Sequence, residues 1–155
     1  MERSAWRGGK SGPEGQPPRS ELILPFPPGS VVRVRYRGGG TDPRLGGGAL
    51  NIYAGSDIAL HVNPRPKMGV LVLNSHIQGG WGGEERPDGY PVCEAGEVRL
   101  SVWAGPDGFF IQAKGPGDDI PFGYLYAYRL PASPPLDRIT IDLPDLLAVT
   151  AQPEL

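Results

Sequence analysis

Hydrophobic and polar residues alternate along most of the chain in short stretches separated by turn-forming residues. In Val31–Tyr36, for example, arginines alternate with valine and tyrosine. A period of two is typical of a β-strand that buries one of its faces. The intervening turns are rich in glycine and proline, as at Pro27-Pro28-Gly29 and Gly105-Pro106-Asp107-Gly108. This pattern predicts strands over residues 22–24, 31–36, 49–53, 58–65, 70–74, 84–86, 97–103, 109–113, 124–130 and 138–142.

Many short strands with a turn signal every 8–12 residues or so predict an all-β sandwich or jelly roll. Only Leu143–Leu147 could form a helical turn, and Pro144 argues against a longer helix. The length of 155 residues suits one domain. We predict a single domain over residues 21–150, with a flexible Gly/Pro-rich tail over 1–20 and a C-terminal tail over 151–155.

Composition and charge exclude several classes of protein. The 24 glycines and 19 prolines fall mainly in the N-terminal tail and in turns, so they do not indicate low complexity. The net charge of −2 and the lack of a basic block argue against nucleic-acid binding. Cys93 is the only cysteine, which excludes an internal disulfide and a Cys-based zinc site.

The chain carries no apolar stretch of a length that would cross a bilayer and no apolar signal region in residues 1–20. We therefore expect no membrane insertion. We also expect the protein to be cytoplasmic at synthesis, with export by a non-conventional route left open.

Polar side chains gather on three consecutive predicted strands and on the loop that precedes the third. In a strand alternate side chains share a face, so His61, Asn63 and Arg65 point the same way. The next strand ends with an asparagine in register to join them, and Glu84 and Arg86 share a face after a loop. Three adjacent strands could thus present one cluster on a concave face. The seven candidate residues are His61, Asn63, Arg65, Asn74, Trp81, Glu84 and Arg86.

This set of side chains suits a neutral sugar. Arginine brings a rigid fork of donors, asparagine both a donor and an acceptor, and glutamate acceptors only. Galactose has an axial 4-hydroxyl, which leaves the C–H groups on its opposite face free to lie flat on an indole such as that of Trp81. A flat aromatic wall beside a polar cluster therefore selects galactose. Pairing of Glu84 with Arg65 and Arg86 would hold the cluster in place before sugar arrives.

The spacing of these residues resembles the signature of the galectins. The run from Trp81 to Arg86 and the segment Arg138–Asp142 are similar to fungal members, whereas the run from His61 to Arg65 is closer to the animal ones. The resemblance covers residues 22–146. Its motifs are His61-x-Asn63-x-Arg65, Val72-x-Asn74 and Trp81-Gly82-x-Glu84-x-Arg86.

The resemblance implies two antiparallel sheets in a jelly-roll-like sandwich, the galectin or concanavalin-like lectin fold. It implies binding of β-galactosides such as lactose and N-acetyllactosamine, with no metal or other cofactor and no catalytic residues. Gly48 is a departure, because many members carry a phenylalanine near that position. Because a disaccharide site is weak, strong effects would require multivalency, so a homo-oligomer (a dimer or a tetramer) is left open.

The resemblance also assigns roles to the candidate residues. It implies that Trp81 stacks on the apolar face of galactose and that Asn74 reaches the 6-hydroxyl, with Glu84 nearby. Glu84 and Arg86 would bind the next sugar, glucose or N-acetylglucosamine. The galactose 4-hydroxyl would be contacted by three side chains, those of His61, Asn63 and Arg65.

Other aromatic and titratable residues receive structural interpretations. Trp103 lies in an apolar strand and is expected to be structural. Tyr124, Tyr126 and Tyr128 alternate on one strand, which predicts a shared face used for packing or for an oligomer surface. His76 is expected in a loop without a partner.

Two other functions are weighed against a galactoside lectin. A sandwich glycoside hydrolase needs two carboxylates that flank one bond, but the adjacent Glu84 and Glu85 would point to opposite faces of a strand. The pattern E-x-D-x-x-E and the nucleophile motif G-x-S-x-G are absent, so we predict no enzyme activity. The second alternative is a module of the same fold that binds a non-galactoside glycan or a protein.

Overall fold

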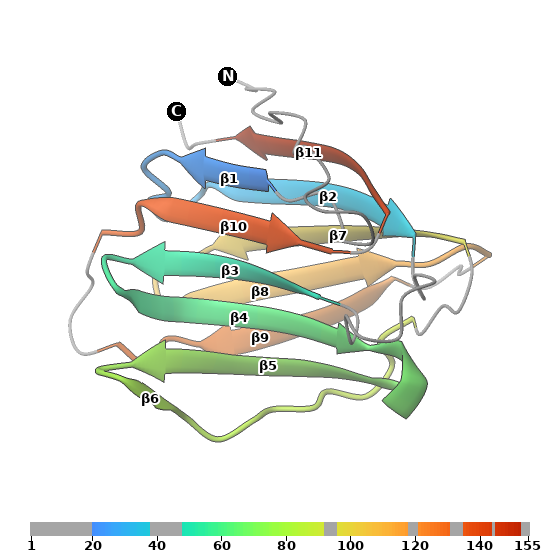
Figure 1. Ribbon diagram of the computed structural model, residues 1–155, viewed down its shortest axis with the longest axis horizontal. Helices are drawn as coiled ribbons and strands as arrows, with labels where there is room; N and C mark the ends of the chain where they lie inside the picture. Colours follow the sequence, from blue (N-terminus) through green and yellow to red (C-terminus); the bar gives the residue numbers. More distant parts are fainter. Residues whose placement is uncertain are drawn as a thin grey trace, which may run out of the picture.

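Two antiparallel sheets stacked face to face make up the protein in this computed structural model, which describes residues 20–37, 48–91, 96–117, 121–130, 135–143 and 145–152. The six-stranded sheet nearer the viewer in Figure 1, here called the front sheet, has the order β1-β10-β3-β4-β5-β6. The five-stranded sheet behind it, the back sheet, has the order β11-β2-β7-β8-β9. The predicted two-sheet β-sandwich is confirmed.

The front sheet comprises β1 (Ser20–Ile23), β10 (Arg138–Asp142), β3 (Ala49–Ala54), β4 (Asp57–Arg65), β5 (Val70–Ile77) and β6 (Gly80–Trp81). The back sheet comprises β11 (Leu146–Gln152), β2 (Val31–Arg37), β7 (Glu97–Ala104), β8 (Gly108–Lys114) and β9 (Phe122–Ala127). A single turn of 3-10 helix, η2 (Pro66–Met68), joins β4 to β5. The first and last strands of the chain lie together along the upper edge in Figure 1, and β5, β6 and β9 lie along the lower one.

The core fills the space between the sheets. Along β7 the exposure alternates strictly, and the inward positions Val98, Leu100 and Val102 are buried. Leu60 and Val62 of β4 do the same for the front sheet, and both are fully buried. Burial of each such side chain contributes about 1.5–3 kcal/mol relative to exposure. The alternation therefore fixes which side chains of each strand face outward.

Paired hydroxyl groups accompany the apolar core. The hydroxyls of Tyr36 and Tyr90 contact each other in the interior. Ser75 Oγ donates to the Ala59 carbonyl (2.8 Å) and lies 2.7 Å from the Tyr126 hydroxyl. These contacts satisfy polar groups that would otherwise be costly to bury.

Most of the predicted strands are present, but the last strand was missed. Residues 143–147 were predicted to allow a helical turn, whereas Leu146–Gln152 forms β11. This segment pairs with β2 from Val31 to Tyr36 and buries Leu146, Val149 and Ala151. Pairing and burial override the weak local preference of a Leu/Ala-rich segment. The strand continues two residues past the predicted domain end at 150.

Further differences concern strand ends. The predicted strand at 84–86 is only an isolated bridge between Leu73 and Glu85. β9 ends at Ala127 rather than at Leu130. The tyrosine face packs inward, since Tyr126 is buried and Tyr124 packs against the core, which confirms the packing interpretation. Cys93 and residues 1–19 of the predicted tail lie outside the described residues.

Gly48 is required by the backbone around it. Its φ is +70°, and a Cβ built on it would lie 1.8 Å from the Asp142 carbonyl oxygen. Its own carbonyl accepts a hydrogen bond from Asn63 Nδ2 (2.6 Å). No larger side chain fits here without moving β10, which accounts for a glycine at this point.

We predict that Gly48→Ala lowers the free energy of unfolding by more than about 2 kcal/mol, because left-handed strain adds to a backbone clash. Gly55→Ala is the matched control. Its φ is +62° with no atom within 4 Å of the added Cβ, so about 1 kcal/mol should be lost. Urea denaturation measures the free energy of unfolding of both variants. Equal losses would show that the contact with Asp142 does not contribute to the destabilisation.

Candidate functional site

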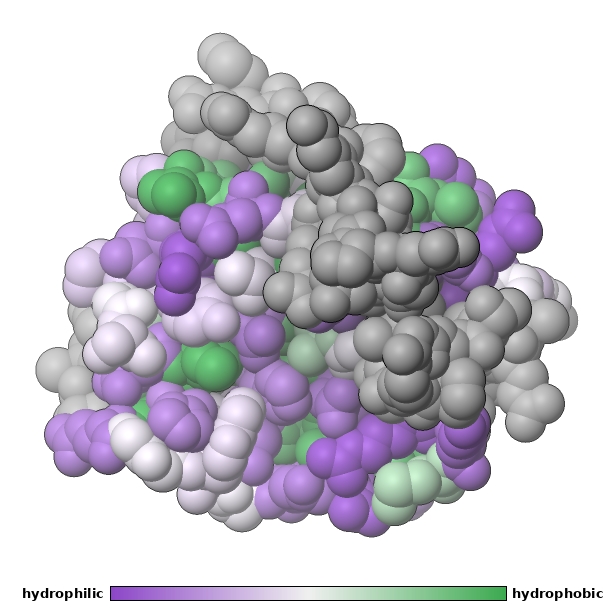
Figure 2. Space-filling view, in the orientation of Figure 1, coloured by the Kyte–Doolittle hydropathy of each residue, from purple (hydrophilic) through white to green (hydrophobic). Residues whose placement is uncertain are grey.

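The outer face of β4 supplies the first three candidate residues. Its register with β3 places His61 opposite Asn51, and its register with β5 places His61 opposite Asn74. Leu60 and Val62 are buried in the core. His61 lies between them and therefore points outward, as do Asn63 and Arg65 farther along the strand. This outer face is mostly hydrophilic where it is visible in Figure 2.

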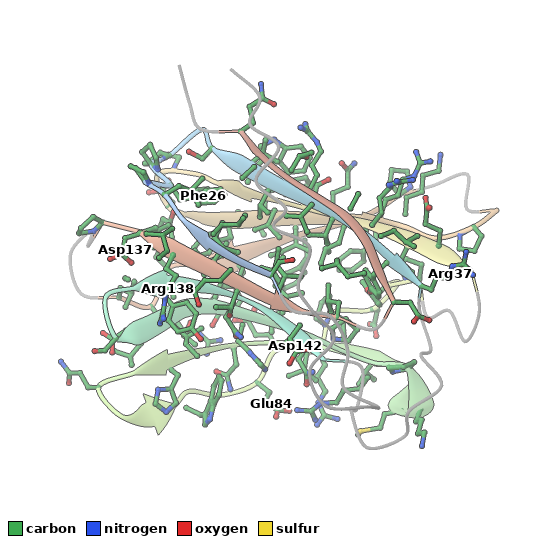
Figure 3. All side chains as sticks on the ribbon, turned by 45° about the horizontal axis from the view of Figure 1, so that its top comes forward. Phe26, Arg37, Glu84, Asp137, Arg138 and Asp142 are labelled. Atoms are coloured by element: carbon green, nitrogen blue, oxygen red, sulfur yellow. The ribbon has the colours of Figure 1, made fainter. Side chains whose placement is uncertain are left out.

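A continuous chain of hydrogen bonds links the polar cluster. Asn63 Nδ2 donates to the Gly48 carbonyl, and Arg65 Nε donates to Asn63 Oδ1 (2.8 Å). Arg65 Nη2 donates to Glu84 Oε1 (3.2 Å), and Arg86 Nε and Nη2 donate to Glu84 Oε2 (3.2 and 2.9 Å). The predicted pairing of Glu84 with both arginines is confirmed. Glu84 is labelled in Figure 3, near the lower strands of the front sheet. These contacts hold the donors and acceptors of the face in one arrangement.

Glu84 is kept in its charged form by its neighbours. The hydrogen bonds from Arg86 lower the pKa of the Glu84 carboxyl most, and the charge and hydrogen bond of Arg65 lower it further, against a smaller desolvation effect. The group is therefore an ionised acceptor at neutral pH. A carboxylate fixed between two guanidinium groups suits hydroxyl donors.

His61 is a neutral ring with an assigned donor. Its Nδ1 lies 2.6 Å from Asn51 Oδ1, an acceptor, so Nδ1 carries the proton and Nε2 is left as an acceptor. The Asn51 amide is oriented in turn by Thr140, whose Oγ1 accepts from Nδ2 (3.5 Å). Burial lowers the pKa of His61, and the charge of Arg65 lowers it further.

Trp81 stands at the edge of this cluster with its indole open to solvent. It follows a tight turn in which Gln78 and Gly79 both have positive φ (52° and 82°), the geometry that suits a two-residue hairpin. Trp81 is 53% exposed, and its indole centroid lies 4.8 Å from that of the His61 ring. A large exposed aromatic ring beside a polar cluster offers a surface on which a flat apolar face can stack.

His76 is not in a loop, as the sequence had suggested. It belongs to β5, because that strand runs on to Ile77, and it pairs directly with Trp81 of β6. Its ring meets the indole edge-on with centroids 4.9 Å apart. The indole is thus bracketed by two histidine rings, and this contact depends on a hairpin longer than predicted.

Asn74 is the most buried of the seven residues, at 4% exposure. Its Nδ2 donates to the Gly82 carbonyl (2.9 Å), and its Oδ1 accepts from the Ser75 backbone N–H (2.8 Å) and from Arg129 Nη1 (3.3 Å). A Cβ on Gly82 would lie 2.9 Å from Arg129 Nη1. Asn74 therefore holds the segment after Trp81, and no described residue accepts a hydrogen bond from its second amide N–H.

Arg129 also belongs to this region, and the sequence pattern did not predict it. Glu84 and Glu85 point to opposite sides, as predicted, and Glu85 pairs with Arg129 and Tyr124 beneath the segment. Arg129 follows β9 and comes from the back-sheet side of the sandwich. No local pattern marks it, because its contacts join segments more than 40 residues apart.

The described residues offer no group of three His, Cys, Asp or Glu side chains that could hold a metal ion. Within the same residues, no helix has the length and apolar character needed to span a membrane. The two adjacent carboxylates lie back to back, so they do not flank a common bond as a glycosidase pair must.

We predict that stability falls as the pH drops through the ordinary histidine pKa of 6.5. The folded-state pKa of His61 is lower, so the unfolded chain binds the proton more readily and protonation favours unfolding. The effect is absent above about pH 7.5. Urea denaturation between pH 8 and 5.5 measures it, and His61→Gln should show a smaller fall. An unchanged fall in that variant would assign the effect elsewhere.

Known proteins resemble this chain in both sequence and structure. The profile of the galactoside-binding lectin family matches residues 17–142. Human galectin-7 is 37% identical over 97 residues, which cover 60% of this chain and 69% of galectin-7. Pig galectin-4 is 41% identical over 69 residues, so the chain spans 21% of that relative's length.

Solved structures of galectins share the fold. A toad ovary galectin in complex with thio-digalactose has a TM-score of 0.67 at 21% identity, covering 86% of this chain and 98% of its own. Ancestral congerin Con-anc has the same score and identity, covering 85% and 98%. The family profile thus matches most of the chain, and the sandwich is shared with solved galectins. The chain belongs to the galectin family of galactoside-binding lectins, which bind their sugars without catalysing a reaction.

Proposed function

We propose that the protein binds lactose and N-acetyllactosamine on the outer face of the front sheet, around Trp81 and the β4 side chains. The observation that carries the proposal is the exposed indole of Trp81 beside the Arg65–Glu84–Arg86 chain of charged groups. The indole supplies an apolar platform, and the charged groups supply a fixed set of hydrogen-bond donors and acceptors. A β-galactoside has both complementary features on one ring.

Galactose would sit with its C–H face on the indole. Its axial 4-hydroxyl then points toward β4, where His61, Asn63 and Arg65 project. A hydroxyl can donate to His61 Nε2 and accept from the Arg65 guanidinium. Glucose, whose 4-hydroxyl is equatorial, would lose these contacts or the stacking.

The second sugar of the disaccharide would lie over Glu84 and Arg86. The Glu84 carboxylate is charged and accepts from donors, and Arg86 supplies donors, with 45% of its side chain exposed. Asn74 would offer its remaining amide N–H to the galactose 6-hydroxyl. The toad ovary galectin of the same fold, solved with thio-digalactose, supports a digalactoside-sized ligand.

Affinity for one disaccharide should be modest, because each hydrogen bond to sugar replaces one to water and nets only about 0.5–1.5 kcal/mol. Cross-linking of glycans would then depend on several sites acting together, as in a dimer or a tetramer.

We predict that lactose binds with a Kd between about 10 µM and 1 mM, measured by isothermal titration calorimetry. Cellobiose, which has no axial 4-hydroxyl, is the matched control and should give no heat. Heat with both sugars would overturn selection through the 4-hydroxyl. Heat with neither would overturn the galactoside assignment and favour a non-galactoside glycan or a protein as the ligand.

We predict that Trp81→Ala weakens lactose binding by about 2 kcal/mol or more, which places it near or beyond the calorimetric limit. The thermal midpoint should change little, since Trp81 is 53% exposed. Trp103→Ala is the control, because Trp103 packs on Phe110 in the back sheet. Unchanged affinity in Trp81→Ala would refute the stacking role.

A further inference from the structure

We propose that Arg129 is a positioning residue that, with Glu85, holds the Trp81–Arg86 segment in its sugar-binding shape without touching the sugar. The inference rests on the proposed function, since the segment carries the indole and the Glu84 carboxylate. Arg129 and Glu85 lie on the inner side of that segment, away from the proposed sugar.

Arg129 makes contacts with three separate parts of the site. Its Nη1 donates to the Gly83 carbonyl (2.7 Å) and to Asn74 Oδ1 (3.3 Å), and its Nη2 donates to the Glu85 carboxylate. Its guanidinium also lies over the Tyr126 ring, 4.8 Å from the centroid. The fork is therefore fixed from both sides, and it joins a segment of the front sheet to the end of β9.

Glu85 is the other half of this arrangement. One carboxylate oxygen pairs with Arg129, and the other accepts from the Tyr124 hydroxyl, a bond that raises the pKa of Tyr124. Its backbone exchanges two hydrogen bonds with Leu73 of β5 (2.8 and 2.9 Å). With side chain and backbone both held, Glu85 fixes the direction in which its neighbour Glu84 must point.

The Arg129–Glu85 pair is only partly open to water. The side chains are 28% and 31% exposed, whereas in the Arg99–Glu97 pair on the back sheet Arg99 is 68% exposed. Charge-assisted hydrogen bonds gain strength as water is excluded, and exposed pairs contribute little. The two pairs therefore allow a matched comparison of a positioned pair with a surface pair.

The Trp81–Arg86 segment needs such support because Gly82 and Gly83 separate the indole from Glu84. Glycines leave the backbone with wide conformational freedom. The carbonyl of Gly82 is held by Asn74 and that of Gly83 by Arg129. A Cβ at position 82 would lie 2.9 Å from Arg129 Nη1, so a side chain there would shift the guanidinium.

Without Arg129 the segment would sample several conformations before sugar arrives. Binding would then have to order it, and this cost would appear as a higher Kd. Lysine cannot replace arginine here, because one ammonium cannot reach the Glu85, Gly83 and Asn74 oxygens as a planar fork does.

The test compares Arg129→Lys and Glu85→Gln with Arg99→Lys and Glu97→Gln, in the full chain. Lactose Kd is measured by calorimetry, the thermal midpoint by circular dichroism, and backbone exchange by hydrogen–deuterium NMR. We expect the first two variants to raise Kd about tenfold, which corresponds to about 1.4 kcal/mol. We expect faster exchange of the Gly82 and Glu85 amides, which donate to Ser75 and Leu73. The back-sheet variants should leave Kd and both amides unchanged.

A lower thermal midpoint with unchanged Kd and unchanged exchange would show a merely structural role and overturn the inference. The double variant is the second check: its loss of affinity should be smaller than the product of the single losses, because both residues act through one contact. Independent losses would also overturn it. The exchange measurement needs no sugar, so it separates failure of this inference from failure of the lactose assignment.

Discussion

The register of β4 between β3 and β5 is the constraint on which the site depends. Successive side chains of a strand point to opposite faces, so a slip of one residue would bury His61 and Asn63 and expose Leu60 and Val62. The side chains of Leu60 and Val62 are fully buried between the sheets. Hydrophobic burial in the core thus determines, at a distance, which polar groups appear on the outer face and in what order.

Charge is distributed on the two sides of one short segment. Glu84 points outward, where two arginines hold it as an exposed, ionised acceptor, and Glu85 points inward, where Arg129 and Tyr124 satisfy it. Each carboxylate therefore has its own hydrogen-bond partners. Adjacent like charges are tolerated because alternation along an extended backbone separates them.

The sequence was sufficient for the sandwich and for the outward cluster because both follow from local alternation. The Glu84 pairs with Arg65 and Arg86 could also be anticipated from spacing. β11 was missed because its identity depends on pairing with β2, far away in the chain, rather than on its own Leu/Ala-rich sequence. Arg129 was missed for the same physical reason: its partners come from β5 and the segment after β6, and no short-range pattern encodes a contact between the two sheets.

A binding face on one sheet is therefore supported from the other. β9 lies behind β4 and β5 in Figure 1, and at this side Tyr126 contacts Ser75 while Arg129 reaches Asn74. A flat sheet edge with a Gly-Gly segment would by itself leave the indole and its neighbouring carboxylate loosely placed. Polar groups of the interior also contact the inner side of the Trp81–Arg86 segment. The stability of the sandwich therefore contributes to the order of the site. The affinity of a shallow, wet site depends strongly on such order, since few contacts are available to offset the entropy lost on binding.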